Sequence, residues 1–323
     1  MPNILKKLNS FTAMRVKYGS YAVIASGSSA STGAGYFGGG LTTVLINGID
    51  KITFPADTKT TLSVTLTTAR QFPAGMANSA VAGYFGGGYD SSYISGIDKI
   101  TFPADTKTTL SVTLTSARSD LAGMANSGVA GYYGGGYDSG FISGIDKITF
   151  PADTKTTLSP TLTSARGNPA GMANSAVAGY FGGGYDGGYV TGVDKITYPA
   201  DTKTTLSPTL TAGCTELAGM ANSGVAGYFG GGYSPTRLNR IDKITFPADT
   251  KTTLSPTLTA GAHVLAGMAN SAVAGYFGGG NDGANPLSGI DKITFPADTK
   301  TTLSPTLTAG CMRLGGMADG NIV

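Results

Sequence analysis

The sequence predicts an all-β protein, a closed six-bladed β-propeller with four antiparallel strands in each blade. Three observations support this fold class. Glycine accounts for 50 of the 323 residues, about twice its usual share. Charged residues make up only 13%, and because Glu, Gln, Lys and Arg populate helix surfaces, their scarcity argues against a helical protein. A unit of 48 residues is repeated six times along the chain, as expected of a repeat architecture.

The repeat is marked by three short strings that recur in the same order. The string Tyr-(Phe/Tyr)-Gly-Gly-Gly is followed by (Ile/Val)-Asp-Lys-Ile and then by Gly-Met-Ala. The first string begins at Tyr36, Tyr84, Tyr132, Tyr180, Tyr228 and Tyr276. A unit of this length with four short strands is typical of a propeller blade.

The places where the repeat begins and stops indicate a closed ring. The first copy enters in the middle of the unit at Gly35, and the last stops at Val323, where the unit would continue into that beginning. An open solenoid usually has atypical caps. We therefore expect the C-terminal strand to complete the first blade and leave no free edge.

Within the third copy, the inner two strands are predicted from small residues and glycines. Leu121–Asn126 has the small side chains of a crowded innermost strand, A. Val129–Gly135 is expected to form strand B, where glycines allow neighbouring backbones to approach closely.

The outer two strands are predicted from alternation and turn residues. Ile142–Phe150 alternates and is β-branched, so it predicts strand C. Residues 151–155 contain Pro and Asp and predict a turn. Thr156–Thr163 is then expected to be strand D, and Pro160 within it indicates an outer edge.

Several of these motifs resemble the kelch repeat. They are the Tyr180–Gly184 string, the Phe150–Thr154 turn and the Leu-Thr-Ser-Ala-Arg ending at Arg166. The resemblance covers residues 35–323 and implies a kelch-like propeller. Two features depart from it, since the chain has no Trp and the terminal Arg is kept only in three copies. That position is occupied by Arg70, Arg118, Arg166, Cys214, Ala262 and Cys311. Kelch domains vary widely in function, so the resemblance predicts the fold and no particular activity.

The net charge of +3 comes from the N-terminal stretch, residues 1–34. This stretch carries Lys6, Lys7, Arg15 and Lys17 and no acidic residue. The remaining chain has 18 basic and 19 acidic residues, which disfavours nucleic-acid binding. The apolar run is too short and too interrupted for a signal peptide or a membrane span. We interpret residues 1–34 as a basic arm that docks onto other proteins of a larger assembly, and residues 35–323 as the propeller.

Comparison of the six copies shows two variable windows in an otherwise nearly identical unit. One follows the glycines, in the B–C connection, and the other joins strand D to the next strand A. In an up-and-down blade these two connections emerge on the same face of the disc. The Tyr, Ser, Gly and Asp content of the first window is typical of recognition loops. The residues assigned to this binding face are Tyr89, Asp90, Tyr93, Asp120, Tyr137, Asp138, Phe141, Tyr185, Asp186, Tyr189, Tyr233, Arg237, Arg240, Glu216, His263 and Arg313.

Groups for catalysis or metal binding are scarce. His263 is the only histidine, so neither a catalytic triad nor a His-rich metal site can be assembled. Glu216 and His263 occupy corresponding loops of successive blades, which could bring them near each other. We expect such proximity to be a coincidence of loop placement rather than a catalytic acid–base pair. Asp90, Asp138 and Asp186 are read as solvated loop acids rather than glycosidase or Ca²⁺ groups. No catalytic residue, metal or cofactor is expected.

Two structural expectations concern charge and sulfur. The Asp-Lys pair of strand C, such as Asp50-Lys51, faces opposite sides of the strand and is expected to link each blade to the next. Cys214 and Cys311 lie two blades apart and are expected to remain free thiols.

These features favour a non-enzymatic structural and binding propeller. In style it resembles a bacteriophage virion component, such as part of a tail or fibre, that presents a variable face to a receptor or a surface glycan. One alternative is a soluble carbohydrate-binding or glycan-processing propeller. Another is an intracellular adaptor of the kelch kind. The location expected for the first interpretation is a virion or an extracellular surface.

Overall fold

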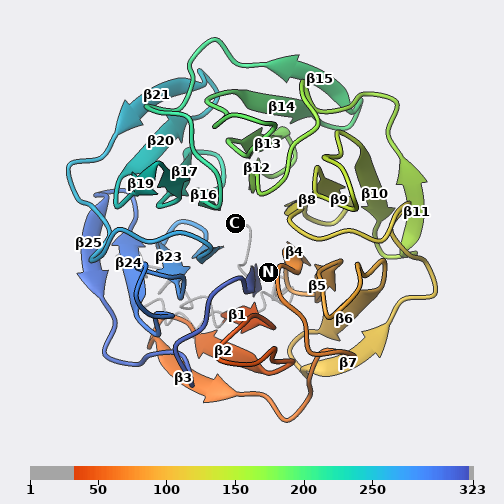
Figure 1. Ribbon diagram of the computed structural model, residues 1–323, viewed down its shortest axis with the longest axis vertical. Helices are drawn as coiled ribbons and strands as arrows, with labels where there is room; N and C mark the ends of the chain where they lie inside the picture. Colours follow the sequence, from red (N-terminus) through yellow and green to blue (C-terminus); the bar gives the residue numbers. More distant parts are fainter. Residues whose placement is uncertain (1–32, 320–323) are drawn as a thin grey trace, which may run out of the picture.

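A computed structural model describes residues 33–319 and arranges them as six four-stranded antiparallel sheets in a ring (Figure 1). The fold class expected from the sequence, a six-bladed β-propeller, is therefore confirmed. In the described part of the chain there is no helix. The innermost strands, A, are β26 (Gly315–Asp319), β4 (Ala74–Asn78), β8 (Ala122–Asn126), β12 (Ala170–Asn174), β16 (Ala218–Asn222) and β22 (Ala266–Asn270).

The other three strands of each blade follow outward in chain order. Strands B are β1 (Ala34–Gly38), β5 (Ala82–Gly86), β9 (Ala130–Gly134), β13 (Ala178–Gly182), β17 (Ala226–Gly230) and β23 (Ala274–Gly278). Strands C are β2 (Ile49–Thr53), β6 (Ile97–Thr101), β10 (Ile145–Thr149), β14 (Val193–Thr197), β20 (Ile241–Thr245) and β24 (Ile290–Thr294). Strands D are β3 (Thr58–Thr61), β7 (Thr106–Thr109), β11 (Thr154–Thr157), β15 (Thr202–Thr205), β21 (Thr250–Thr253) and β25 (Thr299–Thr302). A short hairpin, β18 (Tyr233–Ser234) and β19 (Thr236–Arg237), extends the B–C loop of the fifth blade.

The ring closes as the sequence predicts. The last strand, β26, pairs with β1 from Gly38 opposite Gly315 to Ala34 opposite Asp319. The first blade is therefore assembled from both ends of the described chain (Figure 1).

The boundary expected between the arm and the propeller is slightly wrong. Ala34 is the first residue of β1 and the Gly33 carbonyl accepts a hydrogen bond from the Phe54 amide, so the blade begins before Gly35. The charged residues of the proposed arm, Lys6, Lys7, Arg15 and Lys17, lie outside the described residues.

The expected limits of strand D are wrong. The strand begins at Thr154 rather than Thr156, because the turn is short: the Asp153 amide donates to the Thr149 carbonyl at 2.8 Å and Asp153 has a φ of 55°. Thr154 then already pairs with Thr149. The strand ends at Thr157, so Pro160 lies beyond it. The outermost position of strand D is nevertheless confirmed.

The other strands are found near their expected positions. Strands A and B of the third blade differ by one residue at their ends from the expected ranges. Strand C begins at Ile145 instead of Ile142, because the Ile142 amide donates to the Gly136 carbonyl and so belongs to the B–C loop.

The hydrophobic core lies between the blades. Each buried cluster combines side chains of two neighbouring blades; at the closing junction, Met268 of β22 lies with Phe37 and Phe54 of the first blade. Gly35 of β1 gives this methionine its space, since an added Cβ would lie 2.1 Å from the Met268 sulfur. Glycine at this repeat position therefore leaves room for the methionine of the preceding blade at every junction.

A first polar contact joins each blade to the next on the side of the C–D turns. The Tyr36 hydroxyl donates to Asp105 at 2.8 Å, and the Lys51 ammonium binds the other oxygen of Asp105 at 2.6 Å. Lys51 also lies over the Tyr36 ring, 5.4 Å from its centroid. The same set recurs at all six junctions, with Lys–Asp distances of 2.5–2.6 Å.

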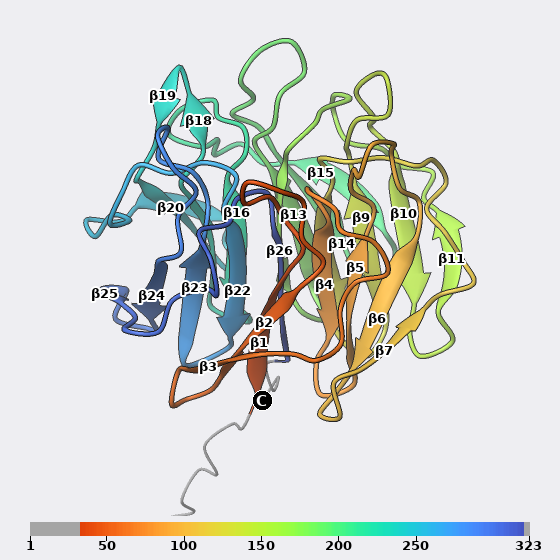
Figure 2. The same cartoon turned by 60° about the horizontal axis from the view of Figure 1, so that its bottom comes forward.

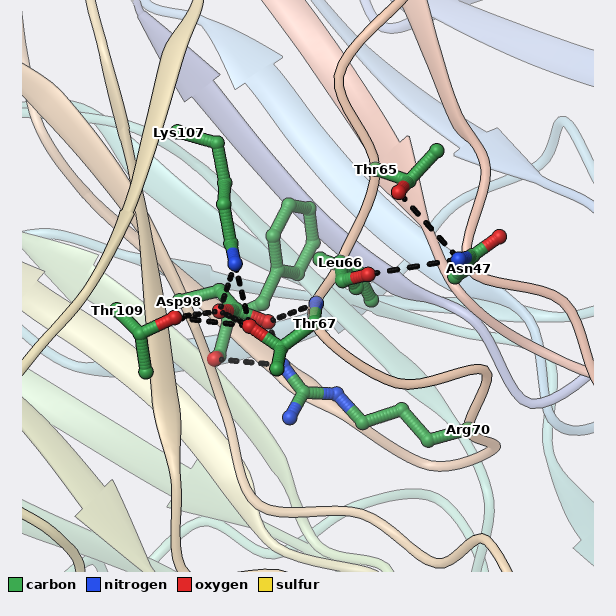
Figure 3. Close-up of polar contacts among 9 residues, drawn as sticks. Asn47, Thr65, Leu66, Thr67, Arg70, Asp98, Lys107 and Thr109 are labelled. Atoms are coloured by element: carbon green, nitrogen blue, oxygen red, sulfur yellow. Dashed lines mark hydrogen bonds and ion pairs between the residues drawn. The ribbon is translucent and has the colours of Figure 1, made fainter.

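A second polar contact, which we call the aspartate clamp, joins the blades further out (Figure 3). Asp98 of β6 accepts hydrogen bonds from the Thr67 amide at 2.9 Å and from the hydroxyls of Thr67 and Thr109. Arg70 binds the same carboxylate at 2.9 Å and Lys107 binds it at 3.3 Å. Burial raises the pKa of Asp98, but the bonds from Thr67 and the charge of Arg70 outweigh it and hold the pKa below its ordinary value.

Together, these two contacts confirm that the Asp-Lys pair of strand C links the blades. The lysine binds the following blade, and the aspartate binds the connection that arrives from the preceding blade.

The innermost strands approach one another closely around the axis. A Cβ added to Gly75 of β4 would lie 2.2 Å from the Gly316 carbonyl oxygen of β26. Because that atom belongs to the backbone, the contact can be relieved only by moving a strand.

We therefore expect Gly75→Ala to destabilise the protein by about 1–3 kcal/mol through overpacking. Gly140→Ala is the matched control, because an added Cβ at Gly140 meets nothing within 4 Å. Denaturant unfolding followed by circular dichroism measures both. Equal midpoints for the two variants would contradict the close approach.

The clamp offers a second comparison between equivalent aspartates. Asp98→Asn leaves the buried guanidinium of Arg70 without its counter-charge, which costs about 3–5 kcal/mol. Asp50 has the same threonine bonds but, among residues 33–319, no arginine within 4 Å. We expect Asp50→Asn to cost only about 1–2 kcal/mol. The same unfolding experiment measures both variants. If Asp50→Asn lowers the free energy of unfolding as much as Asp98→Asn does, the arginine is not the cause of the larger cost.

Candidate binding face

The two variable windows meet on one face of the disc, as the sequence predicts. Gln71, in the D–A connection, exchanges backbone hydrogen bonds of 3.0 and 2.9 Å with Tyr89, at the start of the next B–C loop. Equivalent bridges occur at the other five junctions. Figure 2 shows these loops at the top, with the β18–β19 hairpin, whereas β26 ends at the bottom. We call this side the variable face.

An arc of aromatic rings crosses the variable face from the second blade to the fifth. Each ring lies edge-on or tilted against the next, with centroids 5.3–6.0 Å apart. The arc consists of Tyr89, Tyr93, Tyr137, Phe141, Tyr185, Tyr189, Tyr233 and His263. Phe141, Tyr185 and Tyr189 are 37–38% exposed. The arc is therefore continuous and still open to solvent.

A ring of six equivalent residues surrounds the axis inside the arc. All six have a positive φ of 52–61°, and each of five amides donates to the carbonyl of the preceding member at 2.7–3.2 Å. The members are Phe72, Asp120, Asn168, Glu216, Val264 and Arg313. They line a small axial depression of about 80 Å³. The backbone bonds hold their side chains in fixed places around it.

Two carboxyl groups of this ring have raised pKa values. Burial raises the pKa of Asp120, against the opposing bond from the Ser119 hydroxyl at 2.6 Å. Burial and then the charge of Asp120 raise the pKa of Glu216. Arg313 partly balances both groups and stacks over Phe72, 4.9 Å from the ring centroid.

A pocket of about 180 Å³ connects the arc with the axial ring. Its aromatic wall consists of Tyr137, Phe141 and Tyr185, and its polar wall includes Asp120 and Glu216. Apolar ring faces beside a few hydrogen-bonding groups are typical of a ligand pocket. This pocket is the candidate binding site.

Glu216 and His263 lie close together, as their places in corresponding loops of successive blades suggested. The His263 Nε2 atom is 3.8 Å from the Glu216 carboxylate. His263 Nδ1 donates to the Asn281 carbonyl at 2.9 Å. Burial lowers the pKa of His263, and the charges of Arg237 and Arg313 lower it further. At neutral pH the contact is therefore not an ion pair.

Most of the residues assigned to the face from sequence line the arc or the axial ring. Asp90 and Asp186 instead accept amide hydrogen bonds within their own loops, from Ser92 and Gly188. Asp138 is half-buried at the same repeat position, and Arg237 is exposed on the β18–β19 hairpin.

The assignment of Arg240 to the binding face is wrong. Its guanidinium turns inward, where it donates to the Ala212 carbonyl at 2.8 Å and lies 3.5 Å from Asp242. The reason is that Cys214 replaces the arginine that would otherwise bind this aspartate.

The residues predicted for the binding face omit Phe72, Asn168 and Val264. All three line the axial depression, and Asn168 also lines the candidate site. They occupy the same repeat position as Asp120 and Glu216, so alignment of that single position across the copies would have identified them.

Among residues 33–319, no group of three metal-binding side chains comes together, and no helix is long and apolar enough to span a membrane. Cys214 and Cys311 are buried free thiols, as expected.

Comparison with protein-family models and with curated proteins finds no match to this chain.

Because His263 is the only histidine, its protonation can be read directly by NMR. We expect its imidazole to titrate below about 6.5. Since the folded protein binds this proton less readily than the unfolded chain, the free energy of unfolding falls as the pH drops below that value. Arg237→Ala removes a charge that lowers the pKa and should raise the titration midpoint. A wild-type midpoint above about 6.5 contradicts the prediction.

Proposed function

We propose that the protein is a non-enzymatic propeller that binds a surface carbohydrate in the candidate site of the variable face. The observation that carries the proposal is the position of three rings of the arc, Tyr137, Phe141 and Tyr185, opposite two carboxyl groups in one pocket. A sugar ring has C–H faces that pack on the negative face of an aromatic ring. Its hydroxyl groups need donors and acceptors at the edge.

The polar wall suits such a ligand. Asp120 and Glu216 have raised pKa values, so each can accept a sugar hydroxyl, or donate to one when protonated. The fixed backbone ring keeps these groups in place before binding, which reduces the cost of ordering them.

The repeated architecture supports recognition rather than structure alone. Five of the six blades share an identical Ile-Asp-Lys-Ile string on strand C, whereas the loops of the variable face differ from blade to blade. Loops held by a rigid scaffold are a common place for binding residues. The proposal also assigns the propeller to the kelch type, and this part rests on the kelch-like motifs described in the sequence analysis.

The proposal is tested on a glycan array, followed by calorimetry with the best binder. Tyr137→Ala, Phe141→Ala and Tyr185→Ala should each weaken binding at least about tenfold, since aromatic side chains that a ligand covers are typical hot spots.

Val81→Ala and Val129→Ala are the matched controls, because both side chains are exposed, at 46% and 47%, in A–B turns on the opposite face. Equal loss in arc variants and controls, or no binding to any glycan, would overturn the proposal.

A glycan-processing site is the second candidate, favoured by the two carboxyl groups with raised pKa values that line one pocket. General-acid chemistry on a glycosidic bond uses such a carboxyl. Release of reducing ends from the bound glycan, lost in Glu216→Gln while binding remains, would favour this function over binding alone.

The proposal also includes membership of a larger particle, such as a phage tail or fibre, through residues 1–34. Mass spectrometry of the native assembly, and removal of the basic residues Lys6, Lys7, Arg15 and Lys17, test this part. A chain that is never found with other proteins would contradict it, without affecting the sugar site.

A further inference from the structure

The six aspartate clamps differ in how they are neutralised. At three junctions an arginine of the D–A connection binds the strand C aspartate at 2.9–3.1 Å. The same guanidinium donates to a backbone carbonyl of strand B, as Arg70 does to the Phe85 oxygen at 3.1 Å. Each arginine therefore bridges a carboxylate and a carbonyl inside the junction.

The fourth junction obtains its guanidinium from a different backbone position. Cys214 stands where the arginine would be, and Arg240, at a position that is glycine in the other copies, reaches Asp242 from the B–C loop at 3.5 Å. A guanidinium thus occupies the same junction by a second route, which indicates that this environment favours it.

The last two junctions have a cavity in this place. Among residues 33–319, neither Asp291 nor Asp50 has an arginine within 4 Å, and each is bound by one lysine. Their side chains are 11% and 12% exposed, whereas the four equivalent aspartates are 1–2% exposed. The cavities measure about 120 Å³ beside Ala262 and about 400 Å³ beside Cys311.

The larger cavity, between the sixth and the first blade, combines an apolar lining with one carboxylate. Phe37, Leu45 and Leu307 contribute apolar surface, and Asp50 contributes its carboxylate. Asp98 binds both the Thr67 amide and Arg70 through its Oδ2 atom. The equivalent Oδ2 of Asp50 keeps the amide bond, from Thr308 at 2.7 Å, and among residues 33–319 has no arginine.

The glycine opposite Cys311 gives the side chain at this position the same space as the glycine opposite Arg70. In the second blade, an added Cβ at Gly88 would meet the Arg70 stem at 3.2 Å. The equivalent Gly40 lies against Cys311 in the same way, since its Cβ would be 2.5 Å from the sulfur. The glycine thus leaves the same room at Cys311 as it leaves for Arg70.

We propose that the closing junction is a binding site for a small compound that carries a guanidinium group on a short apolar chain. The planar group takes the place of the Arg70 guanidinium, between the Asp50 carboxylate and the Phe37 carbonyl, and the chain packs on Leu45 and Leu307. This site is distinct from the carbohydrate pocket and does not depend on it.

Hydration favours guanidinium over ammonium. In the second blade one terminal nitrogen of Arg70 binds both the Phe85 carbonyl and the Asp98 carboxylate, and a planar guanidinium, which is more weakly hydrated than an ammonium, loses less on entering such a partly apolar junction. Lys59 already places an ammonium 3.2 Å from Asp50 Oδ1. Burial raises the pKa of Asp50, but the bonds from Thr308 and Thr61 outweigh it, so the carboxylate is charged at neutral pH.

The test uses n-propylguanidinium, which reproduces the arginine side chain, with the full-length protein in calorimetry and ligand-observed NMR. Saturable binding is expected, with n-propylurea, its neutral planar counterpart, and n-butylammonium each at least tenfold weaker. Equal binding of the urea, or no saturation by the guanidinium, overturns the proposal.

Three variants locate the site. Cys311→Arg fills the cavity from within and should abolish binding, whereas Ala262→Arg, at the smaller cavity, should leave it unchanged. Asp50→Asn should weaken binding of n-propylguanidinium at least tenfold. This variant tests whether the ligand occupies the cavity even if Cys311→Arg does not fold. Undiminished binding in folded Asp50→Asn or Cys311→Arg would show that the ligand sits elsewhere and overturn the assignment.

Discussion

The contact on which the whole ring depends is the carboxylate of strand C clamped by the chain that arrives from the preceding blade. Asp98 shows it in full: the backbone and hydroxyl of Thr67, a threonine of its own blade and Arg70 all converge on one buried group. Removing a charge from water is costly unless every oxygen finds partners. Because the partners come from two blades, the carboxylate is stabilised only when the blades are in register. The six clamps therefore hold the six sheets together as one ring.

Glycine provides the complementary condition, because the clamps can form only where the blades come close. Gly35 makes space for Met268 across a junction, and Gly75 allows β4 to lie against β26 at the axis. At Gly35 a larger residue would have to displace the end of the Met268 side chain, and at Gly75 it would have to move a strand, because the nearest atoms there belong to the backbone. The glycine excess of the sequence is thus concentrated where blades meet.

Much of the fold could be predicted because a 48-residue unit is repeated six times in the sequence, so each strand and turn motif can be compared across six copies. The limits of strand D could not be predicted, because Thr-Lys-Thr-Thr has no alternation of apolar and polar residues and the turn before it is closed by an amide of Asp153.

The side of the disc that carries the variable loops was predictable, because the B–C and D–A connections of an up-and-down blade leave the same end of the strands. The aromatic arc, the axial ring and the inward turn of Arg240 were not, since each depends on distances between blades that the sequence does not contain. Cys214, Ala262 and Cys311 did mark the altered junctions, but only the structure shows that one is filled by another residue and two contain cavities.

The two faces of the disc therefore differ in how readily their side chains can be substituted without loss of the fold. On the side of the C–D turns, Tyr36, Lys51 and Asp105 and their equivalents are the same at every junction, because each group binds two others. A substitution there would leave a charge or a hydroxyl without its partner. On the variable face, the backbone bonds between the D–A connection and the B–C loop hold the loops in place whatever side chains they carry. Side chains can then change without loss of the fold, and this separation of backbone support from side-chain identity leaves one face of a repetitive ring free to vary.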